Sequence, residues 1–306
     1  MFLPYFLLTG VAFIWGLNSV LGKALVSYLP PFAITAGRFS IAGVILILWL
    51  LWKRKSLPPP ESRLPLFLLG LAGVFAFNSM IYTGLQYTSA INCALINGFT
   101  PIVTMFLAAL ALKEKVTWPQ AGGALLSLLG VAMIIGGGSL RVFLSLSFNY
   151  GDLIIILSTL VWAFYTVYGK KVMATVSPMD TIAYSTLAAL PFLWTVGFWE
   201  LRDFSLPPLS WFLVLAILFL GVFASVVAYL WWNTGVQRLG AARGVNFLNL
   251  IPVFSVISSA IFLGERLHPH QAAGGALILL GVLLSSAMAR QKARPRVSPL
   301  PSERAG

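Results

Sequence analysis

An internal repeat constrains this chain more than any other feature of its sequence. The stretch at 98–135, shifted by 151 positions, aligns without a gap with residues 249–286. The identical pairs in that register include Pro101/Pro252, Ala109/Ala260, Leu112/Leu263, Glu114/Glu265, Gln120/Gln271, Gly123/Gly274, Gly130/Gly281 and Val131/Val282. A duplication of this length predicts two structurally equivalent halves.

The composition places both halves in a membrane. The chain is 59% hydrophobic and 9% charged, whereas soluble domains are about 25% charged, and its mean hydropathy is +0.91. A membrane helix needs about 20 apolar residues. We therefore predict an all-α membrane protein with ten transmembrane helices, at approximately 4–22, 32–52, 65–86, 90–112, 118–138, 152–171, 178–199, 211–233, 242–263 and 270–289.

The net charge of +12 would suggest a nucleic-acid partner in a soluble protein. With the N-terminus placed in the cytoplasm, however, fifteen of the 20 Lys and Arg residues fall on the cytoplasmic side of the predicted helices. This distribution follows the positive-inside rule and predicts that both termini are cytoplasmic. No nucleic acid is needed to explain the charge, and the lipid bilayer is the expected surrounding.

Each half holds five predicted helices, and this odd number makes the second half enter the membrane from the opposite side. The first helices also match, at a shift of 147, through Trp15-Gly16 and Trp162-Ala163, and Pro31 matches Pro178. We predict a first repeat at 1–145, an inverted second repeat at 146–289 and a basic disordered cytoplasmic tail at 290–306. Inverted repeats are typical of transporters, because two halves can alternate around one central site.

The sequence lacks the features that several other functions would require. The single cysteine, Cys93, excludes an intrachain disulfide and is expected in the apolar core. There is no phosphate-binding glycine loop, and no paired acids, histidine cluster or serine with a base is predicted at membrane depth. We therefore expect no enzyme, cofactor or metal, and either a monomer or a homodimer.

The motifs resemble a known family. WGLNSVLGK at 15–23, WAFYTVYGKK at 162–171 and the repeated P-x(12)-E-x(5)-Q-x(2)-G-x(6)-GV are similar to the EamA family of the drug/metabolite transporter superfamily. The resemblance covers the chain from Tyr5 to Met288. It implies ten helices in two inverted halves, a central cavity lined mainly by the first, third, fourth, sixth, eighth and ninth helices, and export of amino acids or related metabolites across the bacterial inner membrane.

Polar and aromatic residues form stripes on those six helices. Residues three, four and seven apart share a helix face, and by this spacing we predict a substrate cavity lined by Trp15, Asn18, Asn78, Tyr82, Asn97, Trp162, Tyr165, Tyr229, Asn246 and Asn249. Such a pocket suits a small amphipathic or aromatic solute. The alternative is that these side chains only bind neighbouring helices, at about 0.6 kcal/mol per hydrogen bond. Trp231 and Trp232 remain open between the cavity and the interfacial aromatic belt.

Two prolines and one arginine complete the candidate site. Pro101 and Pro252 interrupt the fourth and ninth helices, and act either as hinges or as static kinks. Arg38 lies about seven residues into the second helix and is a candidate anion anchor, since a guanidinium can grip a carboxylate at two points. We favour a structural role for it, because its depth permits snorkelling to the outer interface and its helix is not an expected lining helix.

The acidic residues indicate how transport is driven. All eight Asp and Glu residues, and both histidines, are expected at helix ends or in loops, whereas proton coupling usually needs an acid or histidine inside the membrane. The hypothesis that follows is facilitated transport or exchange without obligatory proton coupling. Glu114 and Glu265 are expected to cap or pair in the turns before the fifth and tenth helices.

The sequence thus predicts an inner-membrane, alternating-access exporter of small metabolites, most of all amino acids. A multidrug exporter for lipophilic cations would want a carboxylate in the first helix, where Asn18 stands. A sugar-phosphate carrier would want several cations facing the cavity, where only Arg38 and Lys23 are available. A sensor or assembly protein is the alternative outside transport.

Overall fold

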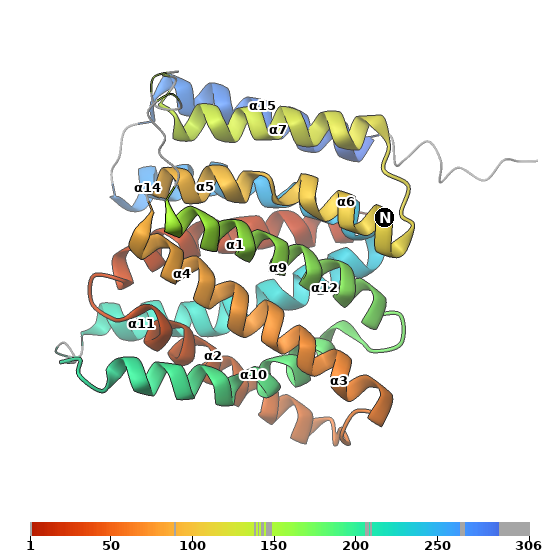
Figure 1. The fold of residues 1–306 in the computed structure, drawn as a ribbon, viewed down its shortest axis with the longest axis vertical. Helices are drawn as coiled ribbons and strands as arrows, with labels where there is room; N and C mark the ends of the chain where they lie inside the picture. The colour runs from red at the N-terminus through yellow and green to blue at the C-terminus, as the bar shows by residue number, and fades with distance from the viewer. Residues whose placement is uncertain are drawn as a thin grey trace, which may run out of the picture.

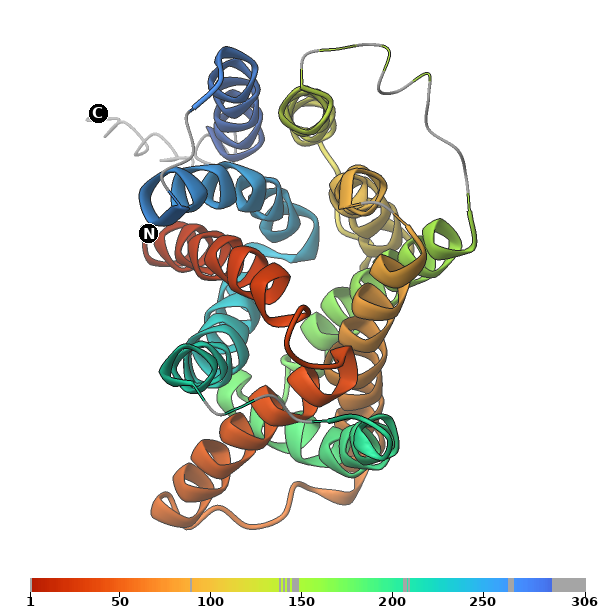
Figure 2. The same ribbon diagram turned by 90° about the vertical axis from the view of Figure 1, so that its left-hand side faces the viewer.

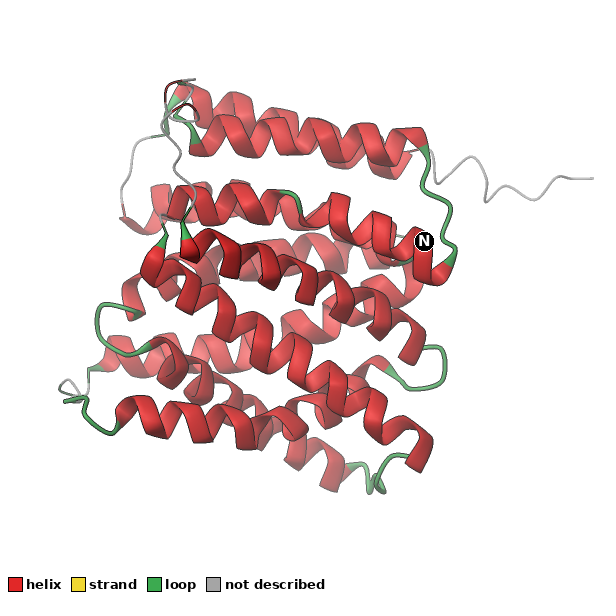
Figure 3. Cartoon of the chain, in the orientation of Figure 1, coloured by secondary structure: helices red, strands yellow, loops and turns green. Residues whose placement is uncertain are grey.

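Helices make up the secondary structure of the described residues, which in this computed structural model are 2–88, 90–137, 139, 141, 144, 149–205, 208, 210–263 and 267–287. Figure 3 draws no strand in those ranges. The first half contains α1 (Leu3–Leu25), α2 (Pro31–Trp52), α3 (Pro60–Leu69), η1 (Gly70–Ala76), α4 (Phe77–Tyr87), α5 (Ala90–Gly98), α6 (Thr100–Leu112) and α7 (Trp118–Ile135). The second contains α9 (Tyr150–Val172), α10 (Pro178–Leu201), α11 (Trp211–Phe219), η2 (Leu220–Val227), α12 (Ala228–Leu239), α13 (Ala241–Gly244), η3 (Val245–Leu250), α14 (Ile251–Leu263) and α15 (Pro269–Ala287).

Eight helical spans of the described chain are long and apolar enough to cross a membrane. They are Leu3–Gly22, Pro31–Trp52, Pro60–Gly84, Trp118–Ile135, Tyr150–Val172, Pro178–Leu201, Trp211–Leu239 and Ala241–Ser258. Two further apolar helices, Ile96–Leu112 and Pro269–Ser285, are shorter. Length and composition therefore support eight of the ten expected spans, and the other two, at 90–112 and 270–289, correspond to the two shorter apolar helices.

Prolines and capping side chains determine where several helices begin. α2 and α10 start at Pro31 and Pro178, whose fixed φ suits the first turn and whose missing N–H costs no hydrogen bond there. Asn149 caps α9 and exchanges hydrogen bonds with Asp152, while Thr117 and Gln120 form the same capping box at the start of α7. These local signals explain why the predicted starts of the helices agree with the observed ones within a few residues.

Two helices contain a π-helical segment at repeat-related positions. η1 interrupts the helix from Pro60 to Tyr87, and η2 interrupts the helix from Trp211 to Leu239. A π turn inserts an extra residue and loosens the backbone hydrogen bonds, and polar side chains fill the gaps. The Ser225 hydroxyl donates to the carbonyl of Leu220 at 2.9 Å, and the Asn78 amide donates to the carbonyls of Gly73 and Val74 at 3.0 Å.

The first helix of each half packs inside the other half. α1 lies against α12 and α14, and α9 lies against α4 and α6. Figure 2 shows α1 beside the blue and teal helices of the second half and α9 beside the orange and yellow helices of the first half. At the lower edge of Figure 1, α2 packs against α10. The halves are thus interleaved, and residues from both reach the centre.

Glycines join α7 to α15 along the upper edge of Figure 1. A Cβ atom added at Gly130 would lie 2.5 Å from the carbonyl oxygen of Gly274, and one at Gly274 would lie 2.6 Å from that of Gly130. Gly123 and Gly281 face each other in the same way, and the Ser127 hydroxyl donates to the carbonyl of Ile278 at 3.4 Å. Low numbers in one helix thus meet high numbers in the other, so the two helices are antiparallel and only glycine permits their close approach.

Candidate functional site

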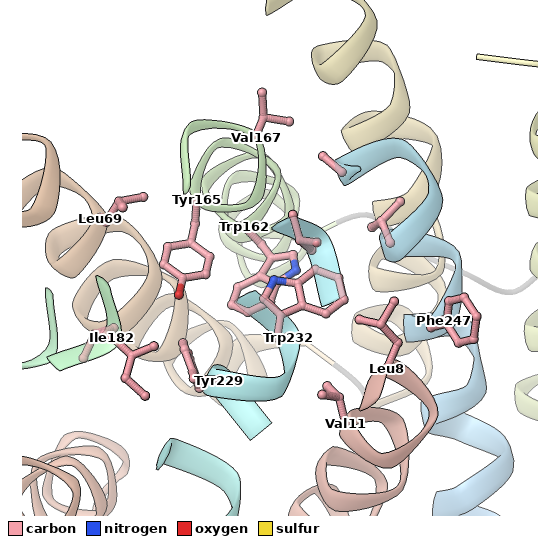
Figure 4. Packing of buried hydrophobic residues seen from close by; sticks show 14 of the residues in the cluster. Leu8, Val11, Leu69, Trp162, Tyr165, Val167, Ile182, Tyr229, Trp232 and Phe247 are labelled. Carbon is pink, nitrogen blue, oxygen red and sulfur yellow. The ribbon is translucent and has the colours of Figure 1, made fainter. Parts of the chain in front are cut away.

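Five aromatic side chains meet where the two halves interleave, and we call them the aromatic centre: Trp15, Trp162, Tyr165, Tyr229 and Trp232. Trp15 lies 5.3 Å from Trp162 and 5.7 Å from Tyr229, measured between ring centroids. Trp162 lies 5.1 Å from Tyr165 and 5.7 Å from Trp232. Figure 4 shows Trp162 and Tyr165 of α9 meeting Tyr229 and Trp232 of α12. Four of these were predicted cavity residues, whereas Trp232, which the sequence left open, is fully buried here rather than at an interface.

The π segments hold two members of the aromatic centre. The Trp15 indole donates to the carbonyl of Ala224 in η2 at 3.1 Å. The Tyr229 hydroxyl donates to the carbonyl of Gly73 in η1 at 2.9 Å. Carbonyls that lose an ideal helical partner in a π turn are available to side chains. Each π segment therefore positions a ring that reaches it from another helix.

Repeat-related polar residues bind each other across the centre. The Asn78 amide donates to the Tyr229 hydroxyl at 3.1 Å, and these two positions are 151 residues apart. The Tyr165 hydroxyl donates to the Asn233 amide oxygen at 3.1 Å. Tyr82, the repeat partner of Asn233, is also buried. The bond between Asn78 and Tyr229 joins the two halves, while the bond between Tyr165 and Asn233 lies within the second half.

Arg38 lies beside the aromatic centre and does not reach the surface. Only 2% of the residue is exposed, so its side chain does not snorkel to the outer interface, which its depth in the helix would have permitted. Its Nε donates to the Ser225 hydroxyl at 2.8 Å and its Nη1 to the Asn18 amide oxygen at 3.4 Å. Packing of α2 against η2 draws the side chain inward. We call Asn18, Arg38 and Ser225 the Arg38 cluster.

Several buried polar atoms, in the aromatic centre and elsewhere on α12 and η3, have no hydrogen-bond partner among the described residues. They include the indole nitrogens of Trp162 and Trp232, both side-chain polar atoms of Asn246 and the amide nitrogens of Asn233 and Asn249. Leaving such groups unpaired costs about 1–3 kcal/mol each. Unpartnered polar groups at this density are what a site for a polar solute or for water requires.

The remaining predicted residues lie further from the aromatic centre. Asn97 donates to the Cys93 sulfur at 3.4 Å and accepts from the Thr159 hydroxyl at 3.5 Å, so it links α5 to α9. Pro101 lies in the first turn of α6, after a break at Phe99. Pro252 follows the 3₁₀ segment η3. Both helices are interrupted where the prolines predict it.

Glu114 has a different partner from the one expected. Its carboxylate accepts hydrogen bonds from the backbone nitrogens of Ala241 and Ala242, at 3.1 and 3.0 Å, and so caps α13 of the other half. The turn before α7 needs no such cap, because Thr117 and Gln120 already supply one. Close by, Lys170 donates to the carbonyl of Gln237. We call this side of the bundle the Glu114 end. Glu265 lies outside the described residues.

The opposite side, the Glu200 end, is hollowed. Glu200 accepts from the backbone nitrogens of Phe32 and Ala33 at 2.8 and 3.1 Å and so caps α2. A cavity of about 380 Å³ opens there, lined by Val26, Ser27, Tyr28, Leu29, Pro30, Pro31, Gln86, Glu200 and Phe204. None of its lining residues is a predicted site residue, and the aromatic centre itself is packed. Side chains of the described acids lie at helix ends or connections, as the sequence predicts.

Sequence reasoning missed the π segments and gave Arg38 too little weight. The only sequence signal was the recurrence of a glycine at equivalent places, Gly70 and Gly221. A Cβ at Gly221 would lie 3.0 Å from the carbonyl oxygen of Arg38, and Gly70 similarly faces the carbonyl of Ser185. Both glycines mark where a helix with a π segment touches the second helix of the other half.

Comparisons with known proteins agree on one family. The model of the EamA-like transporter family matches residues 2–136 and 149–287. The uncharacterized transporter YyaM of Bacillus subtilis (strain 168) is 33% identical over 288 residues, which cover 94% of each chain. A probable terminal-alkyne amino-acid exporter of Streptantibioticus cattleyicolor is 26% identical over 74% of each chain.

Two further matches are a relative that aligns with part of the chain and a solved structure that has the same fold. An S-adenosylmethionine/S-adenosylhomocysteine transporter of Chlamydia muridarum is 35% identical over 130 residues, covering 42% of this chain and 41% of that one. A solved crystal structure is 21% identical, covers 95% of this chain and 98% of its own, and superimposes with a TM-score of 0.79. At that identity the likeness is one of fold.

Proposed function

Because the chain belongs to the EamA-like transporter family, we propose that it exports small metabolites, most of all amino acids, across the bacterial plasma membrane. That the protein is a multi-pass membrane transporter follows from its family and its apolar helices. An amino-acid substrate is supported by the name of one relative, the probable terminal-alkyne amino-acid exporter. Two relatives with named solutes differ in what they carry, so the solute has to be argued from the site.

The proposed mechanism is alternating access between two inverted five-helix repeats, 1–145 and 146–289. The eight long spans and the two shorter apolar helices together make ten. The antiparallel glycine contacts of α7 with α15 support an inverted relation, because Gly130 meets Gly274 while Gly123 meets Gly281. So does the hydrogen bond between the repeat partners Asn78 and Tyr229. Two such halves can exchange conformations about one central site.

The aromatic centre and its unpartnered polar atoms are the observation that carries the proposal. Rings from both halves supply apolar faces at the point where the halves meet, and unpaired amides and indoles supply donors beside them. This combination suits an amphipathic solute. The breaks before Pro101 and Pro252 would let α5–α6 and η3–α14 bend when the site opens.

We propose that the Glu114 end faces the cytoplasm. The positive-inside distribution favours both termini and the basic tail at 290–306 on that side. Glu114 joins α6 to α13, and Lys170 joins α9 to α12, so this end is held closed by bonds between helices. The cavity lies at the other end. We therefore propose that the structure represents a conformation closed toward the cytoplasm.

Binding and efflux together test the proposal. The purified protein should show a higher melting temperature with its amino-acid substrate, because a ligand that binds only the folded state stabilises it. Proteoliposomes should release the same amino acid. Trp15→Ala, Asn78→Ala and Tyr229→Ala should abolish both effects, while Trp211→Ala, at a residue that is 81% exposed, should change neither.

A negative result has a clear meaning. If no amino acid alters the melting temperature or leaves the proteoliposomes, the proposed substrate class is wrong. Efflux of lipophilic cations instead would support the multidrug alternative, which a buried Arg38 disfavours because it would repel them. An unchanged melting shift in all three variants would place the site away from the aromatic centre.

A further inference from the structure

Arg38 is a buried cation with neutral neighbours. Among the described residues, no Asp or Glu pairs with it, and its two hydrogen bonds go to the hydroxyl of Ser225 and the amide oxygen of Asn18. A guanidinium cannot lose its proton in a protein and carries five N–H donors. A charge inside a membrane is expensive unless it is paired. This residue is therefore suited to receive an anion from outside the protein.

The Arg38 cluster occurs in one half only. At the repeat shifts, Arg38 corresponds to Ser185, Asn18 to Tyr165 and Ser225 to Val74. The backbone contacts are nevertheless retained, because Gly221 packs against the Arg38 carbonyl as Gly70 packs against that of Ser185. The two halves thus share a scaffold and differ in the side chains placed on it. A single cationic site beside a central pocket orients a solute that has one anionic end.

The cluster adjoins the aromatic centre. The Arg38 guanidinium carbon lies 4.9 Å from the Phe39 ring, which lies 5.9 Å from the Tyr229 ring. Ser225 directly follows Ala224, whose carbonyl binds the Trp15 indole. An anionic group at Arg38 and an apolar group on the aromatic rings can therefore belong to the same small molecule.

Residues at helical spacing lie between the lining of the cavity at the Glu200 end and this cluster. Val26 lines the cavity, and Gly22 and Asn18 lie four and eight residues before it, on the same face of α1. Eight residues of helix span about 12 Å. Tyr82 lies beside this face, with its hydroxyl 3.6 Å from the place of a Cβ at Gly22. Rotation of the Tyr82 side chain would connect the cavity with Asn18.

We propose that Arg38, with Asn18 and Ser225, binds the carboxylate of the transported solute while the aromatic centre binds its apolar part. The proposal rests on the proposed transport function and narrows it to solutes with a free carboxylate. A planar guanidinium can hold a carboxylate with two parallel hydrogen bonds. Amines and amides of the same shape would lack this contact.

The test compares acids with their amides. Melting-temperature titrations of the purified full chain use phenylalanine against phenylalaninamide and leucine against leucinamide. We expect the wild type to bind whichever of the two acids has the higher affinity at least about tenfold more tightly than the corresponding amide, because the amide lacks the negative charge that would pair with the buried guanidinium. Arg38→Gln should bring the two affinities within about twofold, and Arg38→Lys should retain part of the preference because it keeps only a point charge.

Ser185→Ala is the matched control, because it changes the repeat-related position in the other half, and it should keep the wild-type preference. The proposal is overturned if the wild type binds amide and acid equally or if Arg38→Gln keeps the preference. Should Arg38→Gln fail to fold, an unchanged preference in both Arg38→Lys and Asn18→Ala would overturn it as well. Failure of the transport function is a separate outcome, in which neither acid nor amide binds to any variant, and it removes both proposals.

Discussion

Removing the Glu114 carboxylate should open the Glu114 end of the protein. The carboxylate accepts two backbone N–H groups of α13, at 3.1 and 3.0 Å, and both bonds are partly buried. In Glu114→Ala these donors lose their partner, and loss of such a cap costs about 0.5–2 kcal/mol. Because α6 and α13 belong to different halves, the bonds exist only while that end is closed.

The size of the expected opening follows from the free energy that the closed state alone would lose. A loss of about 1.4 kcal/mol in the closed state alone changes its ratio to the open state about tenfold. Glu114→Gln keeps one acceptor oxygen and should give a smaller change. Glu61→Ala, at an exposed acid in the first turn of α3, is the control and should give none.

Thiol labelling measures the opening directly. The only native cysteine, Cys93, is replaced by Ala, and Val245, which is fully buried in η3, by Cys. A membrane-impermeant thiol reagent applied from the cytoplasmic side should then label Val245→Cys about tenfold faster when Glu114→Ala is added. An unchanged labelling rate, together with a lower melting temperature, would refute the reasoning, since Glu114 would then stabilise both states equally.

Three other predictions concern packing, surface charge and energy coupling. Gly130→Leu should destabilise the protein by about 1–3 kcal/mol through overpacking against Gly274, measured as a lower melting temperature, whereas Gly122→Ala, where the nearest atom is 4.0 Å away, should have little effect. Lys55→Ala should change stability by less than about 1 kcal/mol, because its 3.0 Å pair with Asp180 is partly exposed, and a larger drop would contradict this. An imposed pH gradient without a solute gradient should drive no flux into proteoliposomes, and flux under that condition would show proton coupling.

Local chemistry explains the parts of the fold that could be predicted. The starts at Pro31, Trp118 and Pro178 agree with the predicted spans, because proline and capping residues act within one turn. The repeat predicted which positions of the two halves would be equivalent. The structure brings equivalent positions into contact in the hydrogen bond of Asn78 with Tyr229, and it packs glycines of α7 against glycines of α15. Trp15, Trp162, Tyr165 and Tyr229 could be assembled from helix periodicity combined with the family resemblance.

The rest depends on contacts between distant segments. The partners of Arg38 and Glu114 lie 187 and 127 residues away, and no periodicity within one helix indicates them. Trp232 could not be placed, since a residue near a helix end is buried or interfacial according to what packs on it. The π segments were missed because an apolar pattern tolerates one inserted residue without losing its hydrophobic character.

The extra residue in each π segment has a consequence for how such a helix can change. An α-helix turns by about 100° per residue, so converting η1 to regular α-helix with all of its residues kept would rotate α4 about its axis by about that angle. Asn78 would then turn away from Tyr229, and Tyr82 away from α1. Each π segment sets the angular phase in which its helix presents residues to the other half.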